Sequence, residues 1–129
     1  MNTYKHNGKL YRVFSITAFN RHYNVIVTKE QYLNGKLALM VLNLIDNGDF
    51  NNQTRTELFG MLTTNISSCL SNDTEAFVKT YSENEEWAED LAVAIGGIKE
   101  NISVPAGYEE IPLYDFNNLN IYADENSGS

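Results

Sequence analysis

The chain is short of the residues that most catalytic and metal sites require. It holds one cysteine, Cys69, and two histidines, His6 and His22, among 129 residues. An internal disulfide is therefore impossible, and no cysteine–histidine group stands at zinc-ligand spacing. We expect both histidines to be exposed, His6 beside a hairpin turn and His22 in a turn, and Cys69 to be a small buried hydrophobe. Because no nucleophile with a base in reach can be assembled from these residues, the sequence predicts a protein that is not an enzyme and uses no metal or cofactor.

Long apolar runs and phosphate-binding glycine loops are also missing. No run approaches the roughly 20 apolar residues of a membrane span, and no apolar leader follows Met1. We therefore expect a soluble cytoplasmic protein with no membrane partner. A length of 129 residues with 43% hydrophobic residues suits one globular domain, which we place at residues 1–122, followed by a flexible polar tail at residues 123–129.

Basic residues are few and unevenly placed. Residues 1–64 hold seven bases and four acids, a charge of +3, whereas residues 65–129 hold two bases and thirteen acids, a charge of −11. Nucleic-acid binding relies on clustered Lys and Arg that displace counterions from phosphates. Direct binding of DNA or RNA is therefore disfavoured, and the acidic half should instead attract a basic surface such as that of a nucleic-acid-binding protein.

The pattern of the first half of the chain predicts β-strands. Asn7-Gly8 between two short runs predicts a two-residue hairpin turn, and residues 9–19 follow as one long strand whose two apolar faces predict a central position in a sheet. Residues 20–24 predict the next turn. The run 36–45 has the composition of either a buried strand or a helix, and we interpret it as a strand. Further strands are expected at residues 25–27, 57–66 and 74–81, with a bulge at Gly60.

One helix is expected in the second half. Ser82 followed by Glu85 matches a capping box, which predicts a helix over residues 83–95 that ends at Gly96-Gly97. Its apolar stripe should pack through Trp87, Leu91 and Ile95. Pro112, in a later strand, predicts an edge strand or a strand end.

These elements together predict an α+β fold. We expect a single domain with an antiparallel sheet of five to seven strands, packed by one main helix. The residues expected in the core beside the helix stripe are Phe14, Ile16, Val25, Val27, Leu39, Val41 and Phe77.

The carboxylates of "SENEEWAED", residues 82–90, are the candidate site. A helix places Glu85, Glu86 and Glu89 opposite the Trp87 stripe with Asp90 on the flank, and an exposed Val93 lies beside them. A second acidic patch is expected at Glu109, Glu110 and Asp115. The acidic helix face has two possible interpretations: a solvated surface without a partner, or a surface that binds a partner.

Four short motifs resemble an uncharacterised bacterial family, a domain of unknown function carried on plasmids, prophages and conjugative elements. They are residues 76–80 (AFVKT), 87–91 (WAEDL), 112–116 (PLYDF) and 34–38 (NGKLA). The chain has Glu86 where the family usually has a proline. The resemblance implies an accessory protein of a mobile element, a class that frequently counters host defences, and it implies no reaction.

The sequence thus predicts a non-enzymatic acidic protein that binds another protein. The expected partner is a basic host protein such as a CRISPR effector or a restriction enzyme, which would make this chain an inhibitor of the anti-CRISPR or anti-restriction type. One alternative is a structural accessory protein that self-associates through exposed aromatics such as Tyr108, Tyr114 and Tyr122. Another alternative is a small-ligand binding module. The oligomeric state stays open.

Overall fold

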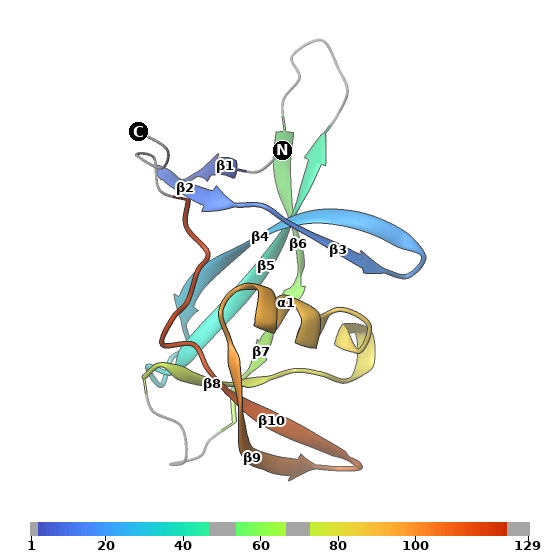
Figure 1. Ribbon diagram of the computed structural model, residues 1–129, viewed down its shortest axis with the longest axis vertical. Coiled ribbons are helices and arrows are strands. Elements are labelled where there is room, and N and C mark those ends of the chain that lie inside the picture. The colour runs from blue at the N-terminus through green and yellow to red at the C-terminus, as the bar shows by residue number, and fades with distance from the viewer. Residues whose placement is uncertain (1–2, 47–53, 67–72, 124–129) are drawn as a thin grey trace.

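The protein is mostly β-structure. The computed structural model describes residues 3–46, 54–66 and 73–123, with 59% strand, 10% helix, three sheets and one α-helix (Figure 1). The predicted α+β domain, one sheet of five to seven strands packed by one main helix, is therefore wrong. The prediction failed because the strands divide among three sheets and because the α-helix is only seven residues long.

The largest sheet is antiparallel and has the order β3-β4-β5-β6. Its strands are β3 (Phe14–Ala18), β4 (Arg21–Gln31), β5 (Leu37–Asp46) and β6 (Thr54–Met61). The strand interpretation of residues 36–45 is confirmed by β5, whose apolar run is buried on both faces. The bulge at Gly60 is also confirmed. Val41 pairs with Gly60 and Leu42 with Leu58, so Phe59 is an extra residue of β6 with no partner residue on β5.

The second sheet has the order β7-β8-β10-β9. Its strands are β7 (Thr63–Thr64), β8 (Glu75–Val78), β10 (Glu109–Asp115) and β9 (Ile98–Ala106). Pro112 lies in β10, between two neighbouring strands, so the predicted edge position or strand end is wrong. The proline fits there because pairing with β8 starts only at Leu113, and because the register with β9 shifts between Pro112 and Tyr114.

A small hairpin, β1 (Thr3–His6) and β2 (Lys9–Arg12), forms the third sheet. Its predicted turn is confirmed, since Asn7 and Gly8 both have positive φ, at 49° and 81°. The single strand predicted over residues 9–19 is wrong, because it breaks between β2 and β3. The Arg12 amide donates to the Ile121 carbonyl at 2.9 Å, which pairs β2 with the C-terminal segment, whereas β3 joins the large sheet at its edge rather than its centre.

The turn predicted over residues 20–24 is also shorter than expected. Phe19 and Asn20, with φ of 54° and 62°, make the turn between β3 and β4, and Arg21 already begins β4. His22 therefore lies in a strand and not in a turn, although it is exposed as expected.

The helical segment of residues 82–95 begins differently from the prediction. A 3-10 turn (Ser82–Asn84) and a further turn precede α1 (Ala88–Ala94). Ser82 has φ of 60°, Tyr81 holds the cap position of the 3-10 turn, and no side chain caps it, so the capping box is wrong. The glycine stop is confirmed, because the Gly97 amide donates to the Ala92 carbonyl at 2.8 Å just after the helix.

The core lies between α1 and the sheets. Figure 1 shows α1 across the middle of the molecule, with the β9–β10 hairpin projecting at one end. The core prediction is confirmed for all but one residue, because Phe14 is only half-buried at the sheet edge. The predicted residues that are buried are Ile16, Val25, Val27, Leu39, Val41, Phe77, Trp87, Leu91 and Ile95.

Candidate functional site

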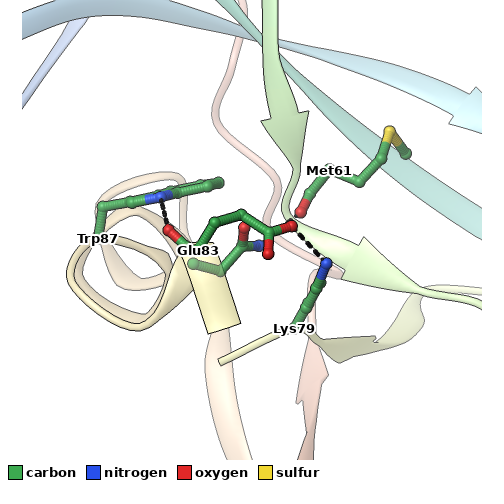
Figure 2. Close-up of polar contacts among 5 residues, drawn as sticks. Met61, Lys79, Glu83 and Trp87 are labelled. Atoms are coloured by element: carbon green, nitrogen blue, oxygen red, sulfur yellow. Dashed lines mark hydrogen bonds and ion pairs between the residues drawn. The ribbon is translucent and has the colours of Figure 1, made fainter. Parts of the chain in front are cut away.

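Trp87 fixes the helical segment to the large sheet. Its side chain is 2% exposed, and its ring meets the ring of Phe59 edge to face at a centroid distance of 5.1 Å. The indole also lies against Gly60, where a Cβ would stand 3.4 Å from the ring, in ordinary van der Waals contact. The indole Nε1 donates a hydrogen bond of 3.0 Å to the Glu83 carbonyl (Figure 2). The indole thus ties the turn before α1 to β6.

Asn84 provides a second connection to the same strand. It is fully buried, and its Nδ2 donates to the Met61 carbonyl at 2.6 Å. Next to it, Lys79 forms an ion pair with Glu83, and Figure 2 shows the two side chains meeting. The hydrogen bond from Lys79 lowers the pKa of Glu83 to about 2. Glu83 is therefore charged at neutral pH, but a local lysine already neutralises it.

The four predicted contact acids of this segment are all exposed, and they differ in their partners. Glu86 accepts a hydrogen bond of 3.2 Å from the Phe19 amide, and Glu89 lies 3.6 Å from Lys99. Glu85 and Asp90 have no ion pair within residues 3–46, 54–66 and 73–123. Glu85 and Glu86 precede α1, so the uninterrupted acidic helix face predicted from the sequence is wrong. The acids instead surround the start of a short helix.

Three adjoining hollows join these acids into one surface. An open hollow of about 350 Å³ is lined by Thr80, Trp87 and all four acids. It shares Thr80 and Glu89 with a hollow of about 280 Å³ along β9 and β10, and shares Trp87 with a groove of about 290 Å³ beside β3. We name these three hollows together the acidic trough. Its linings include six carboxylates and one lysine: Glu85, Glu86, Glu89, Asp90, Glu100, Glu110 and Lys99.

The second predicted patch divides in the structure. Glu110 lines the trough, whereas Glu109 is exposed outside it. Asp115 is half-buried and accepts hydrogen bonds from the Thr74 hydroxyl at 3.2 Å and from the Asn117 amide at 2.9 Å. Its carboxylate therefore stabilises the turn that follows β10. Val93 is 62% exposed, as predicted, but does not line the trough.

Glu100 is the trough residue that sequence reasoning missed. Its hydrogen bond with Glu75, its burial and the nearby charges of Glu75 and Asp115 raise the pKa of Glu100 to about 7. Glu100 lies on β9 and Glu75 on β8, which is separated from the β9–β10 hairpin in the sequence by the helical segment; β10, which carries Asp115, lies between the two strands in the sheet. No local pattern could have indicated this contact, because it depends on strand order.

Neither histidine lines the trough. His6 ends β1, is half-buried rather than exposed as predicted, and stacks on Tyr4, with ring centroids 6.4 Å apart. His22 lies next to the trough, because its Nδ1 stands 2.9 Å from Oγ1 of Thr17, which lines the groove beside β3. Cys69 lies outside the described residues. In the part of the chain that the structure describes, no three His, Cys, Asp or Glu side chains are grouped so as to hold a metal ion. No described helix is long and apolar enough to cross a membrane.

Comparisons with known proteins returned nothing: no protein-family model, no curated protein and no solved structure matches the chain. The family resemblance therefore stays a prediction.

Proposed function

We propose that the protein inhibits a host nucleic-acid-targeting defence protein, such as a CRISPR effector or a restriction enzyme, by binding its basic surface through the acidic trough. The observation that carries the proposal is the excess of negative charge in the trough, whose linings hold one lysine and six carboxyl groups, only one of which, Glu100, has its pKa raised to about 7. No catalytic step is part of the proposal.

The charges suit a site that normally receives nucleic acid. Duplex DNA carries about one negative charge per 1.7 Å, and effectors of this class hold nucleic acid in a positively charged channel. A protein that presents carboxylates from fixed backbone positions can compete for such a channel. Trp87 and Asn84, both buried, hold the acid-bearing segment against β6, so its backbone needs little ordering when the carboxylates bind.

The tyrosines support self-association less well. Tyr114 is 2% exposed, so its predicted exposure is wrong, and Tyr122 packs against Tyr11 with ring centroids 5.1 Å apart. Tyr108, at the tip of the β9–β10 hairpin, and Tyr122, which is 41% exposed, are exposed as predicted. Two tyrosines on separate elements give little apolar area for a stable homodimer.

A capture experiment from a bacterial host lysate tests the proposal. The bait proteins are the wild type and a trough variant that carries Glu85→Gln, Glu86→Gln, Glu89→Gln and Asp90→Asn. A control variant removes the same number and type of charges from exposed positions outside the trough, by Glu30→Gln, Glu57→Gln, Asp73→Asn and Glu109→Gln. Both variants have the same net charge, so they separate a local effect from a global one.

We expect the wild type and the control variant to capture the same nucleic-acid-binding protein and the trough variant to lose it. Addition of the wild type to that purified partner should then inhibit its nucleic-acid binding or cleavage. If the trough variant captures and inhibits the partner as well as the control variant does, the acids are only a solvated surface and the proposal is wrong.

A further inference from the structure

The edge of β3 is open on the side away from β4. β3 is the terminal strand of its sheet, and the two-residue turn at Phe19-Asn20 makes Ala18 and Arg21 the hydrogen-bonded pair that closes the hairpin. Hydrogen-bonded and non-bonded pairs alternate along such a hairpin. The amides and carbonyls of Ser15 and Thr17 therefore point away from β4, and no other described element is paired with them.

Glu86 shows which way this edge faces. The Phe19 amide follows the same alternation as the amides of Ser15 and Thr17, and it donates to Glu86 Oε1 at 3.2 Å. A carboxylate of the trough thus already occupies the place that a neighbouring strand's carbonyl would take at the end of β3. The open edge and the trough are parts of one surface.

A groove of about 290 Å³ runs beside this edge. Residues 14–17 form one wall, and the helical segment forms the other through Trp87, Leu91 and Ala94. Glu86 and Asp90 also line it, and no basic side chain does. Trp87 and Leu91 are buried, so the groove offers a ligand the unpaired backbone groups of β3, the exposed Ala94 and two carboxylates. Edge strands without a partner are the usual receptors for an added strand.

We propose that the partner binds by adding an extended basic segment to the edge of β3, with its alternate Lys or Arg side chains directed to Glu86 and Asp90. The inference rests on the proposed function and specifies how the partner is held. Main-chain hydrogen bonds to Ser15 and Thr17 supply one part of the binding, and the two carboxylates select positive side chains. The added strand covers about five residues, the length of β3.

A basic segment fits this edge better than a second copy of the chain does. Pairing two β3 edges would bring the Glu86 and Asp90 carboxylates of both copies together, in a protein whose net charge is already −8. The other free edge that borders the trough, β9, offers fewer available charges, because Glu89 lies 3.6 Å from Lys99 and Glu100 is hydrogen-bonded with Glu75, with its pKa raised to about 7. The charges therefore select β3 and a basic occupant.

Two synthetic peptides test the inference by calorimetry at low ionic strength. The first alternates Lys and Val over about ten residues, and the second has the same sequence with every backbone amide N-methylated, which keeps every side-chain charge but removes the amide donors from both edges of the strand. Two protein variants accompany the wild type: Thr17→Pro removes the outward amide, and Thr17→Val keeps it. Both variants lose the Thr17–His22 hydrogen bond, so Thr17→Val is a matched control. Proline is tolerated at an outward amide of an edge strand, so β3 should still pair with β4.

We expect the unmethylated peptide to bind the wild type and Thr17→Val alike, and to bind Thr17→Pro at least about tenfold more weakly. The methylated peptide should bind the wild type weakly as well, which tests the inference independently of how Thr17→Pro folds. Equal binding of both peptides to the wild type would overturn strand addition and leave charge-driven binding at the trough intact. Failure of both peptides to bind would overturn the inference and count against the proposed function too.

Discussion

Replacing Trp87 by phenylalanine tests how the acid-bearing segment is held to the sheet. The change removes the hydrogen bond from the indole to the Glu83 carbonyl, a loss of about 1 kcal/mol, since a typical protein hydrogen bond contributes 0.5–1.5 kcal/mol. It also empties part of the space beside Gly60, because phenylalanine is smaller by about two carbons and the nitrogen. At about 0.8 kcal/mol per buried carbon, this loss adds about 1–2 kcal/mol. We therefore expect Trp87→Phe to lower the free energy of unfolding by about 2–3 kcal/mol.

Urea unfolding followed by circular dichroism measures this loss. Fluorescence is unsuitable, because Trp87 is the only tryptophan of the chain. Val93→Ala is the matched control on the same helix, since Val93 is 62% exposed, and it should change the free energy of unfolding by less than about 0.5 kcal/mol. Equal losses in the two variants would refute the assignment of Trp87 as the anchor of the segment.

Two further predictions concern stability. Gly96→Ala should cost at least about 3 kcal/mol, because Gly96 has φ of 99° and its added Cβ would stand 2.3 Å from a backbone carbonyl oxygen. The control Gly35→Ala, with φ of 83° and open space, should cost only about 1–2 kcal/mol, and equal midpoints in urea would contradict this difference. Glu100 has its pKa raised from 4.5 to about 7 by its hydrogen bond with Glu75, so the folded protein retains a proton that the unfolded chain releases. Stability should therefore fall as pH rises from about 4.5 to about 7, and Glu100→Gln should be more stable than the wild type by about 1 kcal/mol at about pH 8, with no gain at about pH 4. A gain of the same size at both pH values would show that the carboxyl titration is not its cause.

Local sequence signals predicted the elements that depend on neighbouring residues. The Asn7-Gly8 turn, the β5 run, the Gly60 bulge and the glycine stop after α1 each follow from backbone preferences within a few residues. The capping box is a local signal that failed, because other contacts compete with it. Ser82 and Glu85 have the spacing of a capping box, but the bonds of Trp87 to Glu83 and of Asn84 to Met61 hold that segment in turns and delay the helix to Ala88.

The candidate site was predictable only as a set of exposed acids. Their run in the sequence indicated Glu85, Glu86, Glu89 and Asp90, and these residues do lie close together in one hollow. The sequence could not predict that Glu110 joins them, nor that the open edge of β3 lies alongside. Both facts depend on strand order, which brings residues 14–17 and 110 to the two ends of the trough.

The dissociation constant of the captured partner, measured at two salt concentrations, tests the central claim most directly. The wild type, the trough variant and the charge-matched control variant are compared at about 0.05 M and about 0.5 M NaCl, where screening of exposed charges differs strongly. Kd for the wild type and the control variant should rise at least about tenfold with salt, and the trough variant should bind weakly at low salt with little salt dependence. A trough variant that binds as tightly as the control variant, with the same salt dependence, would contradict binding through the acidic trough.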